Sequence, residues 1–324
     1  MNGEILFSII TPVYNRADCV ARCIESVICN LNRHSNIEHI IVDDGSSDDS
    51  VSIIEDYALK YSHIHFLKFS KNKGVNAARN AAINVAKGKW CILLDSDDYF
   101  VDNALDIISE TMNDNPKYRH YLFAPDDMLD YFKVNCIIKG ASQKVLYYKD
   151  FLNGYIGGDF IHVCNTQVLR NHPFDERLRI YEGLFFLMFF RDAKQMLFTN
   201  KVVTIRERNR EDSVSKDFLR ISNAVIKRTI LSNVIFLKEF EADLISLGIQ
   251  ERLQTTYLEL LDNYVLMGMY EDANNLIAKI TINNDKKYRI LTFITKFRIG
   301  LVYKLLLRLY LYLKYYVLKT KMKF

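Results

Sequence analysis

Strand and helix patterns alternate regularly over the first hundred residues, and this alternation most constrains the fold. Short apolar, β-branched runs predict buried strands, which lie at 6–11, 39–42, 65–69 and 90–94. Amphipathic patterns between them predict helices at 18–31, 50–61 and 76–85. Such alternation is typical of an α/β fold with a doubly wound, mostly parallel sheet. Ligands of these sheets bind at the carboxyl ends of the strands.

Polar residues follow three of the four predicted strands. Pro12 stops the first strand and precedes Tyr14, Asp43 and Asp44 follow the second strand, and the acidic segment 95–98 follows the fourth. Because the ends of parallel strands meet at one edge, we expect these groups to converge on one crevice. Taken alone, segment 95–98 is also compatible with a solvated loop and helix cap.

Four strings in this region carry a family resemblance. They are SIITPVYNR (8–16), IIVDDGSSD (40–48), NKGVNAARN (72–80) and LLDSDD (93–98). In this order and spacing they resemble the family 2 glycosyltransferases, which have the GT-A fold. The resemblance is strong over residues 5–100, weakens to about Ser215 and then stops.

The resemblance implies a nucleotide-sugar donor, most simply a UDP-sugar, and a divalent cation, Mn²⁺ or Mg²⁺. Asp97 matches the direct metal ligand, and Asp95 matches the contact to the ribose or to a metal-bound water. A hard cation held by few carboxylates can bridge phosphate oxygens and stabilise the leaving diphosphate. The remaining donor-binding positions implied by the family are Pro12, Tyr14, Asp43, Asp44, Asn72 and Arg79, with Arg206, Arg208 and Arg210 as clamps on the leaving group.

The family pattern is incomplete at the catalytic base. Many members carry a Glu-Asp pair at the start of a helix, whereas here Glu182 is followed by Gly183. Glu182 is the predicted base, which would take the proton of an acceptor hydroxyl in a single, inverting displacement. The alternative reading is a carboxylate that stabilises a helix start, and Asp159 or Asp175 is then the next candidate base.

The C-terminal tail is basic and amphipathic. From Tyr288 onward it contains no acid, and at helical spacing one apolar stripe is formed by Ile299, Val302, Leu306, Leu309, Leu313 and Tyr316. Lys304 and Arg308 are predicted on the opposite side. This pattern favours a helix lying on an anionic membrane surface, with homodimerisation or packing on the catalytic domain as alternatives. A membrane surface would suit a glycan acceptor carried on a lipid.

Composition sets the remaining expectations. Six cysteines without a Cys-x-x-Cys pair and no signal peptide predict a cytoplasmic protein. The basic tail adds the prediction that it is peripheral on the inner face of the membrane. A net charge of +4 does not favour nucleic-acid binding. We predict a donor-binding half at 1–101, an acceptor-binding half at 102–215 and a helical region at 216–324.

Two other functions fit parts of the sequence. A nucleotidyltransferase would also place acidic residues at strand ends, but it would show a Gly-rich basic loop after the first strand, which is absent from this sequence. A catalytically decayed transferase that recruits a membrane glycan-assembly complex fits the glycine at position 183. Donor hydrolysis distinguishes this scaffold from an enzyme.

Overall fold

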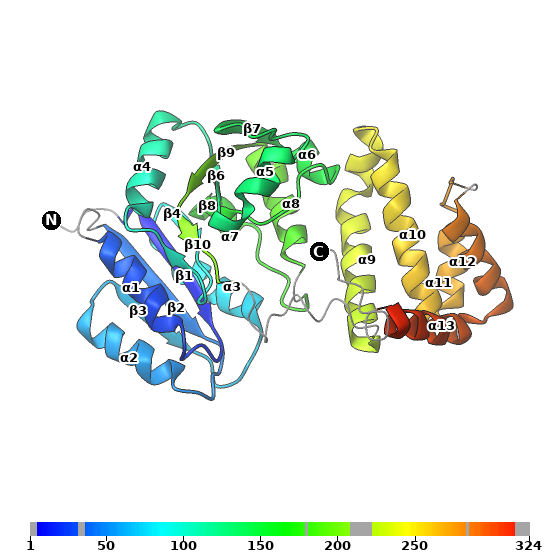
Figure 1. Cartoon of the computed structure of the whole chain (residues 1–324), viewed down its shortest axis with the longest axis horizontal. Coiled ribbons are helices and arrows are strands. Elements are labelled where there is room, and N and C mark those ends of the chain that lie inside the picture. The colour runs from blue at the N-terminus through cyan, green and yellow to red at the C-terminus, as the bar shows by residue number, and fades with distance from the viewer. Residues whose placement is uncertain (1–4, 32–35, 179–180, 208–221, 283–284, 315–324) are drawn as a thin grey trace. The chain divides into compact units, whose positions relative to one another are not determined.

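The computed structural model describes residues 5–31, 36–178, 181–207, 222–282 and 285–314. The chain divides into two compact units, Met1–Glu211 and Asp212–Phe324 (Figure 1). The first contains the sheet and the second is helical. The predicted boundary after Ser215 lies outside the described residues.

A mixed sheet of eight strands forms the centre of the first unit, in the order β3-β2-β1-β4-β8-β6-β9-β7. Its strands are β1 (Phe7–Val13), β2 (Ile37–Asp43), β3 (Ile64–Lys68), β4 (Trp90–Leu93), β6 (His120–Ala124), β7 (Gln143–Tyr147), β8 (Ile161–Asn165) and β9 (Gln195–Val202). Strands β1 to β4 are mutually parallel, whereas β8 runs antiparallel to both β4 and β6. The parallel half places the ends of β2, β1 and β4 side by side.

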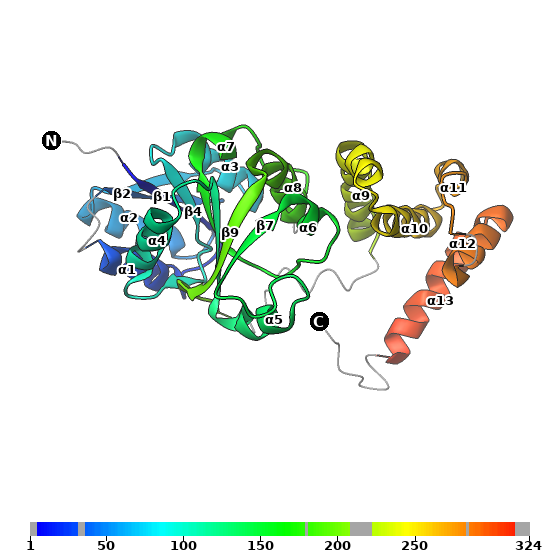
Figure 2. The ribbon, with the colours of Figure 1, turned by 90° about the horizontal axis from the view of Figure 1, so that it is seen from above.

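Helices cover both faces of this sheet (Figure 2). One face carries α1 (Val20–Asn30), α2 (Ser50–Lys60) and α4 (Ala104–Asp114), and the other carries α3 (Val75–Val85), α7 (Thr166–Arg170) and α8 (Glu182–Ala193). Within β1, Phe7 and Ile9 pack toward α1, and Ile10 packs toward α3. The predicted α/β sheet of GT-A type is confirmed.

Pro12 does not end the first strand, contrary to the prediction. β1 continues to Val13, and Pro12 pairs in register with Val42 of β2. On the other side, pairing with β4 stops at Ile10 and Leu93. Because alternate residues of a strand bond to opposite neighbours, the nitrogen of Pro12 lies beyond the last bond to β4. A central strand therefore accommodates the missing donor.

The second half of the sheet unit mixes short helices with strands. The helices are η1 (Asp126–Met128), α5 (Leu129–Val134) and α6 (Tyr148–Leu152). β9 ends at Val202, and a separate short strand β10 (Thr204–Ile205) pairs with β5 (Tyr99–Phe100). This pairing brings residues 206–207 to the acidic segment, because β5 directly follows it.

The second unit contains α9 (Asn223–Ser246), α10 (Gln250–Met267), α11 (Tyr270–Ile277), α12 (Lys286–Phe297) and α13 (Gly300–Tyr312). The tail is thus two helices rather than one, because Arg298 adopts a left-handed conformation that ends α12. The hydroxyl of Tyr270 fixes this corner: it donates to Arg298 O at 2.8 Å and accepts from Gly300 N at 2.9 Å. Among the described residues, no helix is long and apolar enough to span a bilayer.

Candidate active site

Asp44 joins two loops at the end of the parallel strands. Its carboxylate is buried, with Oδ1 accepting from Lys73 N at 2.6 Å and Oδ2 from Gly74 N at 2.8 Å. Gly45 makes this approach possible, since a Cβ there would lie 2.6 Å from the carbonyl carbon of Lys71. The sequence strings 40–48 and 72–80 therefore form one wall, and Asn72 is exposed on it.

The side chain of Asp43 stabilises the loop that directly follows it. Its buried carboxylate accepts from Gly45 N and Ser46 N, both at 3.1 Å to Oδ2. Asn15, with a left-handed φ of 51°, accepts from Ser47 N at 2.8 Å and ties the end of β1 to the same loop. Tyr14 is left 43% exposed beside these contacts. The planar base of a nucleotide could stack on the ring of Tyr14, whereas Asp43 stabilises the backbone of the loop that follows β2.

The acidic segment follows β4 and contains three carboxylates in different environments. The Asp95 side chain is half exposed, that of Asp97 is 26% exposed with Oδ2 3.9 Å from Arg16 Nε, and Asp98 is buried. Burial, followed by the charges of Asp95 and Asp97, raises the pKa of Asp98 to about 8. Because the raised pKa favours the protonated form of Asp98, the negative charge of the segment lies on Asp95 and Asp97, the two carboxylates that are open to solvent.

Arg79 links this segment to the predicted base. Its guanidinium, only 12% exposed, donates from Nη2 to Asp95 Oδ1 at 2.8 Å and from Nη1 to Glu182 Oε1 at 3.2 Å. Arg79 is on α3 and Glu182 is the first residue of α8, 103 positions later. The structure thus brings together three residues that were predicted separately.

The surroundings of Glu182 separate it from the two alternative bases. Asp175 is bound by Arg177 at 2.6 Å, and this hydrogen bonding lowers its pKa. Asp159 pairs with Arg206 at 2.9 Å. A Cβ at Gly183 would meet no atom within 4 Å, so the position beside Glu182 is open. Of these three carboxylates, Glu182 is the one joined to the acidic segment through Arg79.

Arg206 is already matched by carboxylates. Its Nε and Nη2 lie 3.0 and 3.1 Å from Asp127, and its backbone nitrogen donates to Asp126. With Asp159 also bound, the guanidinium supports the loop that follows β10, and its role as a clamp stays a prediction. Arg208 and Arg210 lie outside the described residues.

Two basic residues near the acidic segment, Arg16 and Arg22, were given no role in the sequence analysis. Arg22 donates to the carbonyl oxygen of Asp97 at 3.3 Å, pairs with Glu207 and lies over the ring of Tyr99. Its place on α1 gave no signal, because an arginine on a helix is ordinarily a solvated residue. Arg16 follows a strand end, which was the available hint.

The donor set fits a hard divalent cation. Asp95 and Asp97 offer carboxylate oxygens from one short turn, both are partly open to solvent, and no sulfur or imidazole ligand is needed. Few protein ligands leave coordination positions for phosphate and water, as Mg²⁺ and Mn²⁺ sites on nucleotide substrates require.

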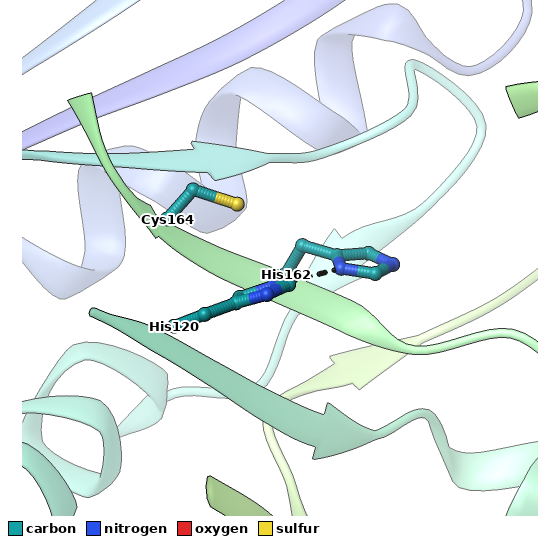
Figure 3. Close-up of side chains that lie close together, drawn as sticks. All are labelled: His120, His162 and Cys164. Carbon is teal, nitrogen blue, oxygen red and sulfur yellow. Dashed lines mark hydrogen bonds between the residues drawn. The ribbon is translucent and has the colours of Figure 1, made fainter. Parts of the chain in front are cut away.

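A second polar cluster lies on β6 and β8 and consists of His120, His162 and Cys164 (Figure 3). The two imidazoles are hydrogen-bonded at 3.0 Å, and His162 stacks on Phe186 with ring centroids 3.7 Å apart. Burial lowers the pKa of His120 well below its usual value and that of His162 to about 3, and it raises the pKa of the Cys164 thiol. These neutral groups hold α8, the helix that begins at Glu182, against the sheet.

The buried imidazoles predict an acid-sensitive fold. Below about pH 6.5 the histidines of the unfolded chain bind protons that His120 and His162 cannot accept in the folded protein. The free energy of unfolding therefore decreases by about 1.4 kcal/mol for each histidine and each unit by which the pH is lowered. Replacing both by phenylalanine removes donor and acceptor together, which can be nearly neutral at pH 7.5. Urea unfolding between about pH 6.5 and 4.5 should show a flatter dependence for the double variant. Parallel curves for the two proteins would contradict this.

Residues 8–138 match the sequence model of the protein family described as glycosyl transferase family 2. Residues 8–138 form a family 2 glycosyltransferase domain. The match includes Asp44, Arg79 and the acidic segment 95–98, whereas Glu182 and Arg206 lie beyond it.

Curated relatives of the family 2 domain share parts of the chain. It is 38% identical over 99 residues to a poly(ribitol-phosphate) beta-glucosyltransferase of Bacillus spizizenii, covering 30% of this chain and 16% of that protein. It is 29% identical over 222 residues to the minor teichoic acid biosynthesis protein GgaA of Bacillus subtilis, covering 64% and 49%. The chain spans less than half the length of each of these two relatives.

Solved structures resemble both units of the chain in fold. Staphylococcus aureus TarS 1–349 in complex with UDP-GlcNAc has a TM-score of 0.61 at 18% identity, covering 88% of this chain and 79% of that one. The mannosyltransferase PcManGT of Pyrobaculum calidifontis, in complex with GDP-Man and Mn²⁺, has a TM-score of 0.55 at 15% identity, covering 92% and 86%. At these identities the likeness concerns the fold.

Proposed function

We propose that the protein transfers a sugar from a nucleotide-diphosphate donor to a hydroxyl group of a glycan, with inversion at the anomeric carbon. One observation carries this proposal: Arg79 holds Glu182 and Asp95 in a single cluster at the strand ends. The candidate base and the candidate donor site therefore lie next to each other, as a single displacement requires.

The chemistry needs only this chain's carboxylates and its polar loops. Glu182 accepts the proton of the acceptor hydroxyl while that oxygen attacks the anomeric carbon. The bond from this carbon to the diphosphate oxygen breaks, and its electron pair leaves with the diphosphate. Asp44 would hold the loop that surrounds the nucleotide base of the donor, and Tyr14 and Asn72 would contact the donor. Arg79 orients Glu182.

Mn²⁺ or Mg²⁺, held by Asp97 with Asp95, would neutralise charge on the leaving diphosphate. Arg79 occupies one oxygen of Asp95 at 2.8 Å, so this carboxylate has its remaining oxygen for the cation, a water or the ribose. The exposed fractions of the two side chains, 50% and 26%, leave room for such a ligand.

The names of relatives and the ligand of one solved structure support the proposed donor and acceptor classes. A TarS fragment binds UDP-GlcNAc, and two curated relatives are named for poly(ribitol-phosphate) glucosylation and teichoic acid biosynthesis. We therefore propose a UDP-sugar and a glycan or lipid-linked acceptor of a bacterial surface polysaccharide. We also propose that the protein works in the cytoplasm, at the inner face of the membrane.

Donor binding tests the proposal. We expect calorimetric titration to show that a UDP-sugar binds about tenfold more tightly with Mn²⁺ than with EDTA, and that GDP-mannose binds more weakly. Slow release of UDP in the absence of acceptor should accompany binding. Binding without turnover under any acceptor would favour the decayed scaffold, and failure of every nucleotide-sugar to bind would overturn the proposal.

A further inference from the structure

Helix α13 contacts the rest of the helical unit through one narrow side. A Cβ on Gly300 would lie 2.2 Å from Val265 O, so α13 and α10 approach closely at this point. One turn later Lys304 is buried, and its Nζ donates to Asn223 Oδ1 at 2.5 Å. The inward side of α13 therefore includes Lys304, which lies opposite the exposed apolar stripe as its spacing predicts.

The opposite side of α13 is apolar and faces solvent. Its exposed side chains are Leu301 (70%), Val302 (52%), Leu305 (56%), Leu306 (60%), Leu309 (54%), Tyr310 (56%) and Leu313 (43%). Spacings of three and four residues place them on one continuous helical face, the outward face of α13. A cluster of this many large apolar side chains is far more than the scattered surface leucines of an ordinary soluble domain.

The charge around this face has a single sign. Residues 286–324 include eleven lysines and arginines and no aspartate or glutamate. Arg308 is exposed at one border of the outward face, and Lys314 lies close to Tyr310, with Nζ 5.8 Å from the ring centroid. Lys319, Lys321 and Lys323 lie outside the described residues.

We infer that the outward face of α13 binds the surface of an anionic phospholipid bilayer, with its leucines among the acyl chains and its basic residues at the headgroups. An amphipathic helix of 13 residues, about 20 Å long, is too short to cross a bilayer and suits the interface. Two copies packed through this face would bring like charges together, whereas an anionic surface complements them. This inference is independent of the proposed transfer chemistry.

Vesicle flotation of the full chain tests the inference. We expect the protein to float with vesicles of phosphatidylcholine and phosphatidylglycerol, and to stay behind with phosphatidylcholine alone at about 0.15 M salt. The variant Leu305→Ser/Leu309→Ser should weaken binding at least tenfold, because each change removes a side chain that would enter the acyl region. Its thermal unfolding should remain that of the parent, because both positions are exposed.

The matched control is Leu59→Ser/Val134→Ser, which changes two side chains in the other unit that are 86% and 83% exposed. It should float like the parent. Equal flotation of the α13 variant and the parent would overturn the inference. The inference would also be overturned if light scattering showed a dimeric parent that does not bind anionic vesicles and a monomeric α13 variant. Donor titration of the same variants is expected to be unchanged, so a failure here stays separate from a failure of the proposed function.

Discussion

Asp97→Asn should abolish metal-dependent sugar transfer and leave the protein folded. We expect a loss of about a thousandfold in turnover, roughly 4 kcal/mol of transition-state stabilisation, because the amide is a poor ligand for a hard cation. Stability should change by less than about 1 kcal/mol, since the Asp97 side chain is partly exposed and its ion pair with Arg16, at 3.9 Å, is loose. Transfer assayed over a Mn²⁺ titration measures the first effect, and thermal unfolding measures the second.

Asp56→Asn supplies the control for this experiment. Asp56 is an exposed carboxylate on α2, away from the strand ends, so the same chemical change there should leave activity as in the parent. Retained metal-dependent activity in Asp97→Asn would remove the metal role from this residue. Loss of activity in both variants would point to a general effect of charge rather than to a ligand.

The positions of the strands in the parallel half of the sheet could be predicted, because runs of apolar residues mark short strands and turn residues mark where they stop. Parallel order then places Asp44 and the acidic segment at one edge without knowledge of any side chain. The contact from Arg79 to Glu182 was not predictable, since it depends on how α8 packs 103 residues further on. The hydrogen bonds of Asp43 to its own loop were missed for a different reason: two adjacent aspartates cannot be told apart by sequence pattern.

The predicted separation of Lys304 from the apolar stripe is met in the helical unit, but the pattern alone left open whether that stripe faces outward or packs inside the protein. A helical pattern separates an apolar side from a basic side but does not say which side the rest of the unit covers. Here Gly300 allows α10 to approach, so Lys304 turns inward and Leu301 and Leu305 turn outward. The break at Arg298 was equally hidden, because a left-handed arginine carries no local signature.

Glu182→Gln should lower turnover by about 10²–10⁴-fold while donor affinity stays within about twofold of the parent. The amide still offers an oxygen to Arg79 Nη1, which now lies 3.2 Å from Glu182 Oε1, so α8 should keep its place. An amide cannot accept the proton of the acceptor hydroxyl. Turnover at saturating donor, together with calorimetric donor affinity, distinguishes a lost base from a lost binding contact.

Two further variants sharpen this test of Glu182. Glu176→Gln, which changes an exposed carboxylate that accepts from Asn80, should behave like the parent. Gly183→Asp, added to Glu182→Gln, should restore part of the turnover, because position 183 has open space for a side chain and the resemblance implies an aspartate there in many members of the family. If Glu182→Gln turns over like the parent, the base lies elsewhere. If donor affinity falls in step with turnover, Glu182 acts through Arg79 on the donor site and takes no proton.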